Sequence, residues 1–169
     1  WRLAAIGLPP IQKKRTAMEF RVARSDELGK IANLYHQVWH ETQAPHQHQD
    51  IASFRDISFM QERIDAFYPN IIIALDEGNL VALVIAKEAR LSQVFVANTV
   101  RGMGVGQRLL ELGEAKLVAE GALRATLNCL VGNDGARRFY ERNGWQVSET
   151  QSKTAQTHSG SVTIKAWEM

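Results

Sequence analysis

The centre of the chain reads Arg101-Gly102-Met103-Gly104-Val105-Gly106. Residues 89–97 precede it with the pattern of a strand, and residues 106–120 follow it with apolar residues at helical spacing. Three glycines in five positions permit positive φ angles and remove Cβ atoms, so backbone N–H groups can converge on an anion. The dipole and free N–H groups of the following helix add to that attraction. The segment therefore predicts an anion-binding loop between a strand and a helix.

Comparison with known phosphate-binding patterns narrows the kind of anion. A Walker loop ends in Gly-Lys-Ser/Thr, whereas this loop ends in GQR at residues 106–108. The dinucleotide pattern G-x-G-x-x-G fails in both registers, because its last position is Gln or Leu. The pattern Arg/Gln-x-x-Gly-x-Gly/Ala fits, with Arg101, Gly104 and Gly106 at its fixed positions. Arg101 and Arg108 can pair with phosphate oxygens from the side.

A second segment, NDGARRFYERNGW at residues 133–145, lies downstream of the loop. With the loop and the order of strands and helices, it makes the chain from Met18 onward resemble the GCN5-related N-acetyltransferase (GNAT) family. In that family the first segment cradles the pyrophosphate of coenzyme A, and the second supplies an Asn and a Tyr near the pantetheine arm and the thiol. The resemblance implies that Asn133 and Tyr140 take these positions, with Tyr140 as the catalytic residue that hydrogen-bonds the departing sulfur.

The expected elements alternate in an α+β order. Strands are expected at residues 19–23, 71–75, 80–87, 89–97, 123–131, 145–149 and 162–167. Helices are expected from residue 25 to about 38, from about 53 to 67, from 106 to about 120 and from 133 or 134 to 144, with a polar loop at 40–50. The resemblance implies the GNAT fold, which is a central mixed, mostly antiparallel twisted sheet of six to seven strands. Helices flank the sheet, and a splayed, V-shaped cofactor slot opens between residues 89–97 and 123–131.

The resemblance also implies acetyl-CoA as co-substrate, and no metal. The backbone of residues 94–96 would pair with the pantetheine amides like an added strand, and a nearby N–H would hold the thioester oxygen. The expected cofactor-binding residues are Val94, Phe95, Val96, Arg101, Gly102, Met103, Gly104, Val105, Gly106, Gln107, Asn133 and Tyr140.

The acceptor side is less defined. Aliphatic amines have pKa values of roughly 8 to 10.4, so a base must remove a proton before acetyl transfer. Many relatives carry an acidic residue near position 92, where this chain has Ser92. Glu88, Glu41 and a water chain remain as alternatives. Trp39, His40 and Glu41 are expected to touch the acceptor, although Trp39 is equally compatible with the core.

Structural interpretations stand beside these assignments. Ala136, Phe139 and Tyr140 share a helical face, so in an arbitrary sequence Tyr140 would be interpreted as a core aromatic. The surrounding motif favours the catalytic role instead. Asn133 fits a helix N-cap, a role compatible with cofactor contact. Gly113 is expected to pack against the sheet, and Cys129 to be a small buried hydrophobe.

Length and charge bound the class of protein. The 169 residues fit a single domain, expected over residues 18–169, with residues 1–17 as an N-terminal extension or flexible arm. Without the four basic residues of that arm, 16 basic and 18 acidic residues remain, a balance that argues against a nucleic-acid partner. The apolar runs are too short to cross a membrane, and a single cysteine indicates a cytoplasmic location.

These observations predict an acetyl-CoA-dependent N-acetyltransferase, an acyltransferase that moves groups other than aminoacyl groups. The acetyl group would pass by direct transfer to its acceptor, a primary amine of a small molecule or peptide. The alternatives are a non-catalytic acyl-CoA-binding or regulatory module and a protein N-terminal acetyltransferase. Relatives are often dimers, so a homodimer is possible.

Overall fold

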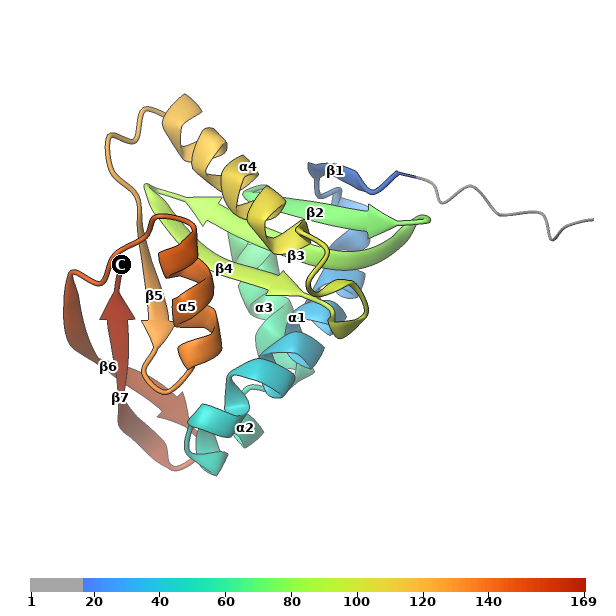
Figure 1. The fold of residues 1–169 in the computed structure, drawn as a ribbon. Helices are drawn as coiled ribbons and strands as arrows, with labels where there is room; N and C mark the ends of the chain where they lie inside the picture. Colours follow the sequence, from blue (N-terminus) through green and yellow to red (C-terminus); the bar gives the residue numbers. More distant parts are fainter. Residues whose placement is uncertain (1–16) are drawn as a thin grey trace, which may run out of the picture.

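Seven strands form one twisted sheet in the computed structural model, which describes residues 17–169 (Figure 1). The strand order is β1-β2-β3-β4-β5-β7-β6, and only the β4–β5 pair is parallel. The mixed, mostly antiparallel sheet is therefore confirmed. The predicted N-terminal extension falls on residues 1–17, of which residues 1–16 lie outside the described part. The strands are β1 (Glu19–Val22), β2 (Ile71–Asp76), β3 (Asn79–Lys87), β4 (Arg90–Val96), β5 (Thr126–Leu130), β6 (Glu149–Thr157) and β7 (Gly160–Glu168).

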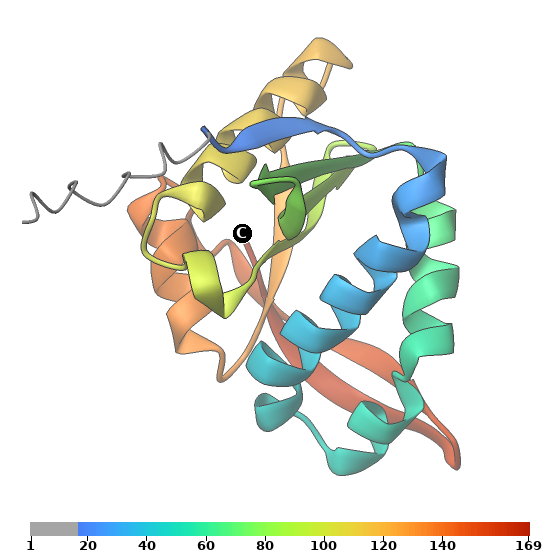
Figure 2. The same ribbon diagram turned by 90° about the vertical axis from the view of Figure 1, so that its right-hand side faces the viewer.

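Helices cover both faces of this sheet. Figure 2 shows α1 and α3 on one side of the sheet and α4 on the other. The helices are α1 (Leu28–Thr42), α2 (Gln49–Phe54), α3 (Ile57–Phe67), α4 (Val105–Ala119) and α5 (Asp134–Arg142). Short 3-10 turns occupy Ser25–Glu27, Ala44–His46 and Asn98–Val100. Among the described residues, no helix combines the length and apolar character needed to span a bilayer.

The polar stretch at residues 40–50 is not the loop that we expected. α1 continues to Thr42, a 3-10 turn follows at Ala44–His46, and α2 begins at Gln49. Pro45 lies at the start of that turn, where a missing N–H costs no hydrogen bond. The single helix expected over residues 53–67 is also wrong, because Asp56 starts a new helix by accepting a hydrogen bond from the Phe59 N–H at 2.9 Å.

Two strand boundaries also differ from the prediction. β5 begins at Thr126 rather than at residue 123, and the Leu123 side chain is fully exposed. β6 begins at Glu149, so residues 145–148 are not part of a strand as expected. Trp145 instead packs beside the core and donates a hydrogen bond from Nε1 to Glu114 at 2.8 Å.

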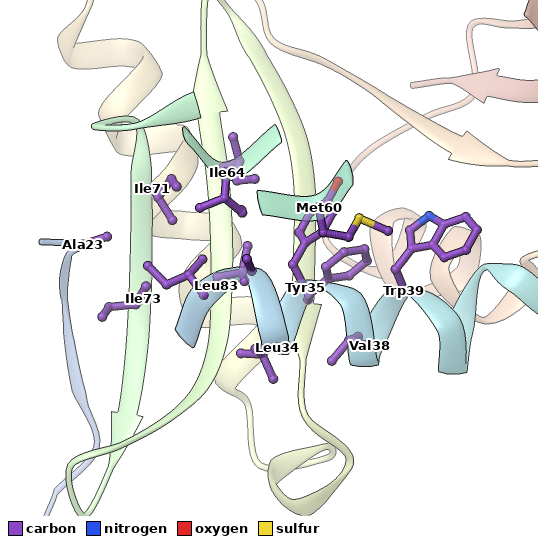
Figure 3. Close-up of a cluster of buried hydrophobic side chains, with 14 of the residues drawn as sticks. Ala23, Leu34, Tyr35, Val38, Trp39, Met60, Ile64, Ile71, Ile73 and Leu83 are labelled. Carbon is purple, nitrogen blue, oxygen red and sulfur yellow. The ribbon is translucent and has the colours of Figure 1, made fainter. Parts of the chain in front are cut away.

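Two hydrophobic clusters anchor the helices to the sheet. One lies under α1 and α3 and includes Tyr35, Trp39 and Met60 (Figure 3). The other lies under α4, where a Cβ on Gly113 would come within 2.6 Å of Leu91 Cδ2. The predicted packing role of Gly113 is confirmed, because only glycine lets α4 lie this close to the sheet.

A β-bulge in β4 opens the sheet. Ile85 pairs with Gln93 and Ala86 with Leu91, so Ser92 is an extra residue without a partner on β3. β4 and β5 pair only at Arg90↔Thr126 and Leu91↔Leu127, immediately before the bulge. Beyond this point the two parallel strands separate, and the expected V-shaped slot is present.

Candidate active site

A cavity of about 840 Å³ fills the slot between the separated strands. Residues 93–96 of β4 and residues 128–130 of β5 form its two sides. Residues of the glycine-rich loop, of α5 and of the C-terminal half of α1 complete the lining. The cavity therefore joins three sequence segments that lie far apart along the chain.

The glycine-rich loop has the backbone conformation that its sequence predicts. Gly102 and Gly104 have φ angles of +76° and +79°, in the left-handed region that favours glycine. Gly104 is also the N-cap of α4, and no side chain caps the helix there, so the first N–H groups are available to a ligand. A Cβ on Gly106 would lie 3.4 Å from the ring of Phe139, which places the loop directly against α5.

The arginine that opens the motif is already engaged. Arg101 donates from Nε to the Val96 carbonyl and from Nη2 to Glu41 Oε2, both at 3.0 Å. Its guanidinium thus ties the loop to the end of β4 and to α1. Arg108 pairs with Glu111 at 3.2 Å and lines a separate hollow beside Phe20.

Eleven of the twelve expected cofactor-binding residues line the cavity, and Met103 does not. Met103 faces the hollow that also contains Arg108 and Phe20. Since its neighbours Gly102 and Gly104 both line the cavity, the loop places Met103 on its outer side.

Asn133 connects two of the elements that line the cavity, α5 and α1. Its Oδ1 accepts a hydrogen bond from the Ala136 N–H at 3.2 Å, which confirms the predicted N-cap of α5. Its Nδ2 donates to the Thr42 carbonyl at 3.3 Å, which joins α5 to the last turn of α1.

Tyr140 is partly buried in the cavity wall, against Phe139 at 5.2 Å between ring centroids. Burial, with a smaller contribution from Cys129, raises the pKa of Tyr140 above that of a free tyrosine. The hydroxyl therefore stays protonated and can donate a hydrogen bond at neutral pH. Burial also raises the pKa of Cys129 to about 11, so this thiol remains neutral, as expected of a small buried hydrophobe.

The residues expected at the acceptor side are not in the cavity lining. Trp39 is buried in the core with the Arg55 guanidinium 4.9 Å from its ring, and His40 Nε2 lies 3.0 Å from the Arg55 carbonyl. The α1 residues that do line the cavity are Val38, Thr42 and Gln43. Sequence reasoning missed them because it ended the helix before its last turn.

Neither of the carboxylates considered as a base is well placed. Glu88 lies in the β3–β4 turn with an 81% exposed side chain, away from the cavity. Glu41 borders the cavity through Arg101, and hydrogen bonds from Gln37 and Arg101 lower its pKa, which weakens it as a base. Within the described chain, no Asp or Glu lines the cavity.

Comparison of structures supports the fold. A GCN5-related N-acetyltransferase from Rhodopseudomonas palustris superposes with a TM-score of 0.69 at 18% identity, over 91% of this chain and 96% of that one. YncA from Salmonella typhimurium, a putative acetyltransferase solved with acetyl-CoA, gives 0.68 at 13% identity over 91% and 94%. PaiA N-acetyltransferase from Thermoplasma acidophilum, solved with coenzyme A, gives 0.64 at 16% identity over 91% and 100%. At these identities the likeness establishes the fold alone.

Sequence comparison supplies the family. No curated protein matches the chain by sequence. The family model of the acetyltransferase (GNAT) family matches residues 31–145, which include both the glycine-rich loop and the segment around Tyr140. Because the match covers more than half of the chain and the sheet carries the expected slot, this chain belongs to the GNAT acetyltransferase family.

Proposed function

We propose that this protein is an N-acetyltransferase that transfers an acetyl group directly from acetyl-CoA to a primary amine of a small molecule or peptide. The observation that carries the proposal is a single cavity that runs from the glycine-rich loop, along the unpaired edge of β4, to Tyr140. An anion-binding loop, a strand edge and a phenol hydroxyl on one cavity suit the three parts of the cofactor.

The cavity suits coenzyme A in both its polar and its apolar parts. The loop N–H groups and the uncapped start of α4 would hold the pyrophosphate. After Leu91, β4 has no strand partner on its β5 side, so the backbone groups of residues 94–96 that face away from β3 are available to the pantetheine amides, except the Val96 carbonyl, which accepts from Arg101. Arg101 would act mainly by fixing the loop, since Val96 and Glu41 occupy its guanidinium.

Tyr140 would act on the leaving group. Bound acetyl-CoA supplies the acetyl thioester. The Tyr140 hydroxyl, kept neutral by its raised pKa, would donate a hydrogen bond to the sulfur as negative charge develops there. A backbone N–H near Phe95 or Val96 would stabilise the carbonyl oxygen in the same way.

The second candidate is a module that binds acyl-CoA without turnover. One observation favours it, namely that no carboxylate of the described chain lines the cavity. Binding to the loop and to the β4 edge needs no base, whereas amine acetylation requires a proton acceptor.

A thiol-release assay separates the two candidates. Purified protein is mixed with acetyl-CoA and a panel of polyamines, aminoglycosides, amino acids and peptides, while calorimetry measures acetyl-CoA binding. Amine-dependent release of coenzyme A that falls in Tyr140→Phe supports the transferase. Tight binding without release from any acceptor supports the module and refutes the proposed activity.

A further inference from the structure

One polar group in the cavity wall has no hydrogen-bond partner. Asn128 is the first β5 residue after the last β4–β5 pair, Leu91↔Leu127, and it lines the cavity. Its Oδ1 is buried and accepts no hydrogen bond from any described residue. A buried amide oxygen without a donor is unfavourable by about 1–3 kcal/mol, so a bound N–H group would satisfy it.

Asn128 and Tyr140 lie on opposite faces of β5. Leu127 and Cys129 belong to the cluster under α4 that also contacts Tyr140. Successive side chains alternate along a strand, so Asn128 points to the other face, the one on which α1 packs against β3 and β4. The same cavity thus has a donor for the leaving sulfur on one face and an acceptor for an N–H group on the other.

A carboxylate lies beside Asn128 on the neighbouring strand. Glu168 of β7 is the direct register partner of Asn128, so the two side chains share a face with Cβ atoms roughly 5 Å apart. Gln151 Nε2 donates to Glu168 Oε2 at 2.8 Å and to Glu149 Oε1 at 2.6 Å. Within the described part of the chain, neither carboxylate forms a salt bridge, so no described cation lies within 4.0 Å of the Glu168 carboxylate.

We propose that Asn128 binds the acceptor amine through an N–H group and that Glu168 takes up the proton which the amine releases. The inference rests on the transferase activity proposed above and completes it, because it supplies the proton acceptor that the cavity lining lacks. The Glu168 charge would also attract the acceptor amine in its protonated form.

The proposed step balances in atoms and charge. The amine nitrogen forms a bond to the thioester carbon, and the carbon–sulfur bond breaks with its electron pair on sulfur. The proton lost by nitrogen goes to the Glu168 carboxylate and then to water, since this side chain is partly exposed. The sulfur, held by the Tyr140 hydroxyl, recovers a proton from solvent, so the products are an amide and a free thiol.

Other charged groups on this face set the potential at Glu168. Glu149 is its direct partner on β6, and Lys153 lies on the same face of β6 four residues further along. Arg90 of β4 lies opposite Thr126, two residues before Asn128. Lys153 and Arg90 are unchanged in both variants below, and Glu149 is replaced only in the control, which therefore reports its own effect on Glu168.

The structure offers a matched pair of variants. Glu168→Gln removes the carboxylate next to the cavity, whereas Glu149→Gln removes a carboxylate that shares its Gln151 donor but pairs with no cavity residue. We expect kcat to fall about 100-fold or more in Glu168→Gln, the usual loss for a general base. The KM for acetyl-CoA should stay within about twofold. Glu149→Gln removes only a neighbouring charge, so its kcat should stay within about fivefold of the wild type.

Three further measurements distinguish chemistry from structure. In Glu168→Gln the deficit should shrink as pH rises toward the pKa of the amine, and Glu168→Asp should recover part of the rate. Asn128→Ala should raise the KM of the acceptor about tenfold, the loss of one hydrogen bond, without changing acetyl-CoA binding. Equal melting temperatures establish that the variants are folded.

The outcomes separate this inference from the function on which it rests. Amine-dependent turnover in the wild type with an equal rate in Glu168→Gln overturns the proton acceptor alone. A rate deficit in Glu168→Gln that does not change with pH, and that Glu168→Asp does not reduce, also overturns Glu168 as the proton acceptor. A wild type that binds acetyl-CoA but acetylates no amine overturns both proposals.

Discussion

Replacement of Tyr140 by Phe tests the chemistry at the leaving group. The change removes one hydroxyl from the cavity wall and leaves the ring contact with Phe139 in place. An unperturbed tyrosine and thiol differ by about 1.5 pKa units, so complete proton transfer to the thiolate costs about 2 kcal/mol. Burial raises the pKa of Tyr140 further and increases that cost. The hydroxyl is therefore expected to donate a hydrogen bond while it keeps its proton.

The magnitude follows from the charge on the sulfur. Hydrogen bonds to charged groups contribute about 1.5–3 kcal/mol, which corresponds to a loss of roughly 10- to 150-fold in kcat. The neutral thioester sulfur is a weak acceptor, so the Kd for acetyl-CoA should change less than about twofold. Because the raised pKa keeps the phenol protonated, its ionisation should not lower the wild-type rate between about pH 9 and 10.

Steady-state thiol release gives kcat, and calorimetry gives the Kd. A loss confined to kcat supports transition-state stabilisation. Equal losses in kcat and affinity would assign Tyr140 to binding, and an unchanged kcat would exclude both roles. The melting temperature should stay the same, because the buried ring is retained.

Three other substitutions test the local structure. Gly104→Ala forces an alanine to φ +79°, so it should lower the unfolding free energy by about 1–2 kcal/mol and weaken acetyl-CoA binding. The control Gly29→Ala in α1 should do neither. Equal behaviour of the two variants in thermal melts and calorimetry would contradict this prediction. Asn133→Ala removes the N-cap of α5 and should lower the unfolding free energy by about 1 kcal/mol, whereas Asn133→Asp should retain the cap. Equal melting temperatures for the two variants would disprove this role of Asn133. The Arg21 pair lowers the pKa of Glu27 from 4.5 to about 2, so the wild-type advantage over Glu27→Gln should be complete above about pH 4.5 and lost as pH falls toward 2. If the difference in unfolding free energy between the wild type and Glu27→Gln, measured with urea, did not change with pH, the ion pair would be excluded as its cause.

The fold was predictable wherever local chemistry determines it. The turn at residues 76–79 and the glycine at position 121 mark their elements directly, and the structure has β2, β3 and α4 close to the expected bounds. The terminal hairpin was predicted too short, because Thr, Ser and Gln alternate along β6 where apolar residues were sought. β6 is stabilised by pairing with β7, and β7 by pairing with β5, and the hydrophobic periodicity of the sequence does not reveal such pairing.

The two halves of the candidate site were unequally predictable for a related reason. The cofactor half depends on a contiguous loop and on one helix, so the resemblance of these two segments to the GNAT family was enough to name its candidate residues. The acceptor half depends on strand register, since Asn128 and Glu168 are adjacent only because β7 pairs with β5. Thr42 and Gln43 likewise reach the cavity because α1 continues past the expected end.

Ser92 connects the slot to the position of the base. As the unpaired residue of the bulge, it bends β4 immediately after Leu91 and ends its pairing with β5. The same bend brings Gln93 to the α1 face, where its Oε1 accepts a hydrogen bond from Gln43 at 3.2 Å. With Gln93 engaged and Ser92 outside the cavity lining, no described side chain of β4 offers an unpaired acceptor to the amine side. The unpartnered oxygen of Asn128 on β5 is therefore the place where an amine can bind, and the nearest carboxylate by strand register comes from β7.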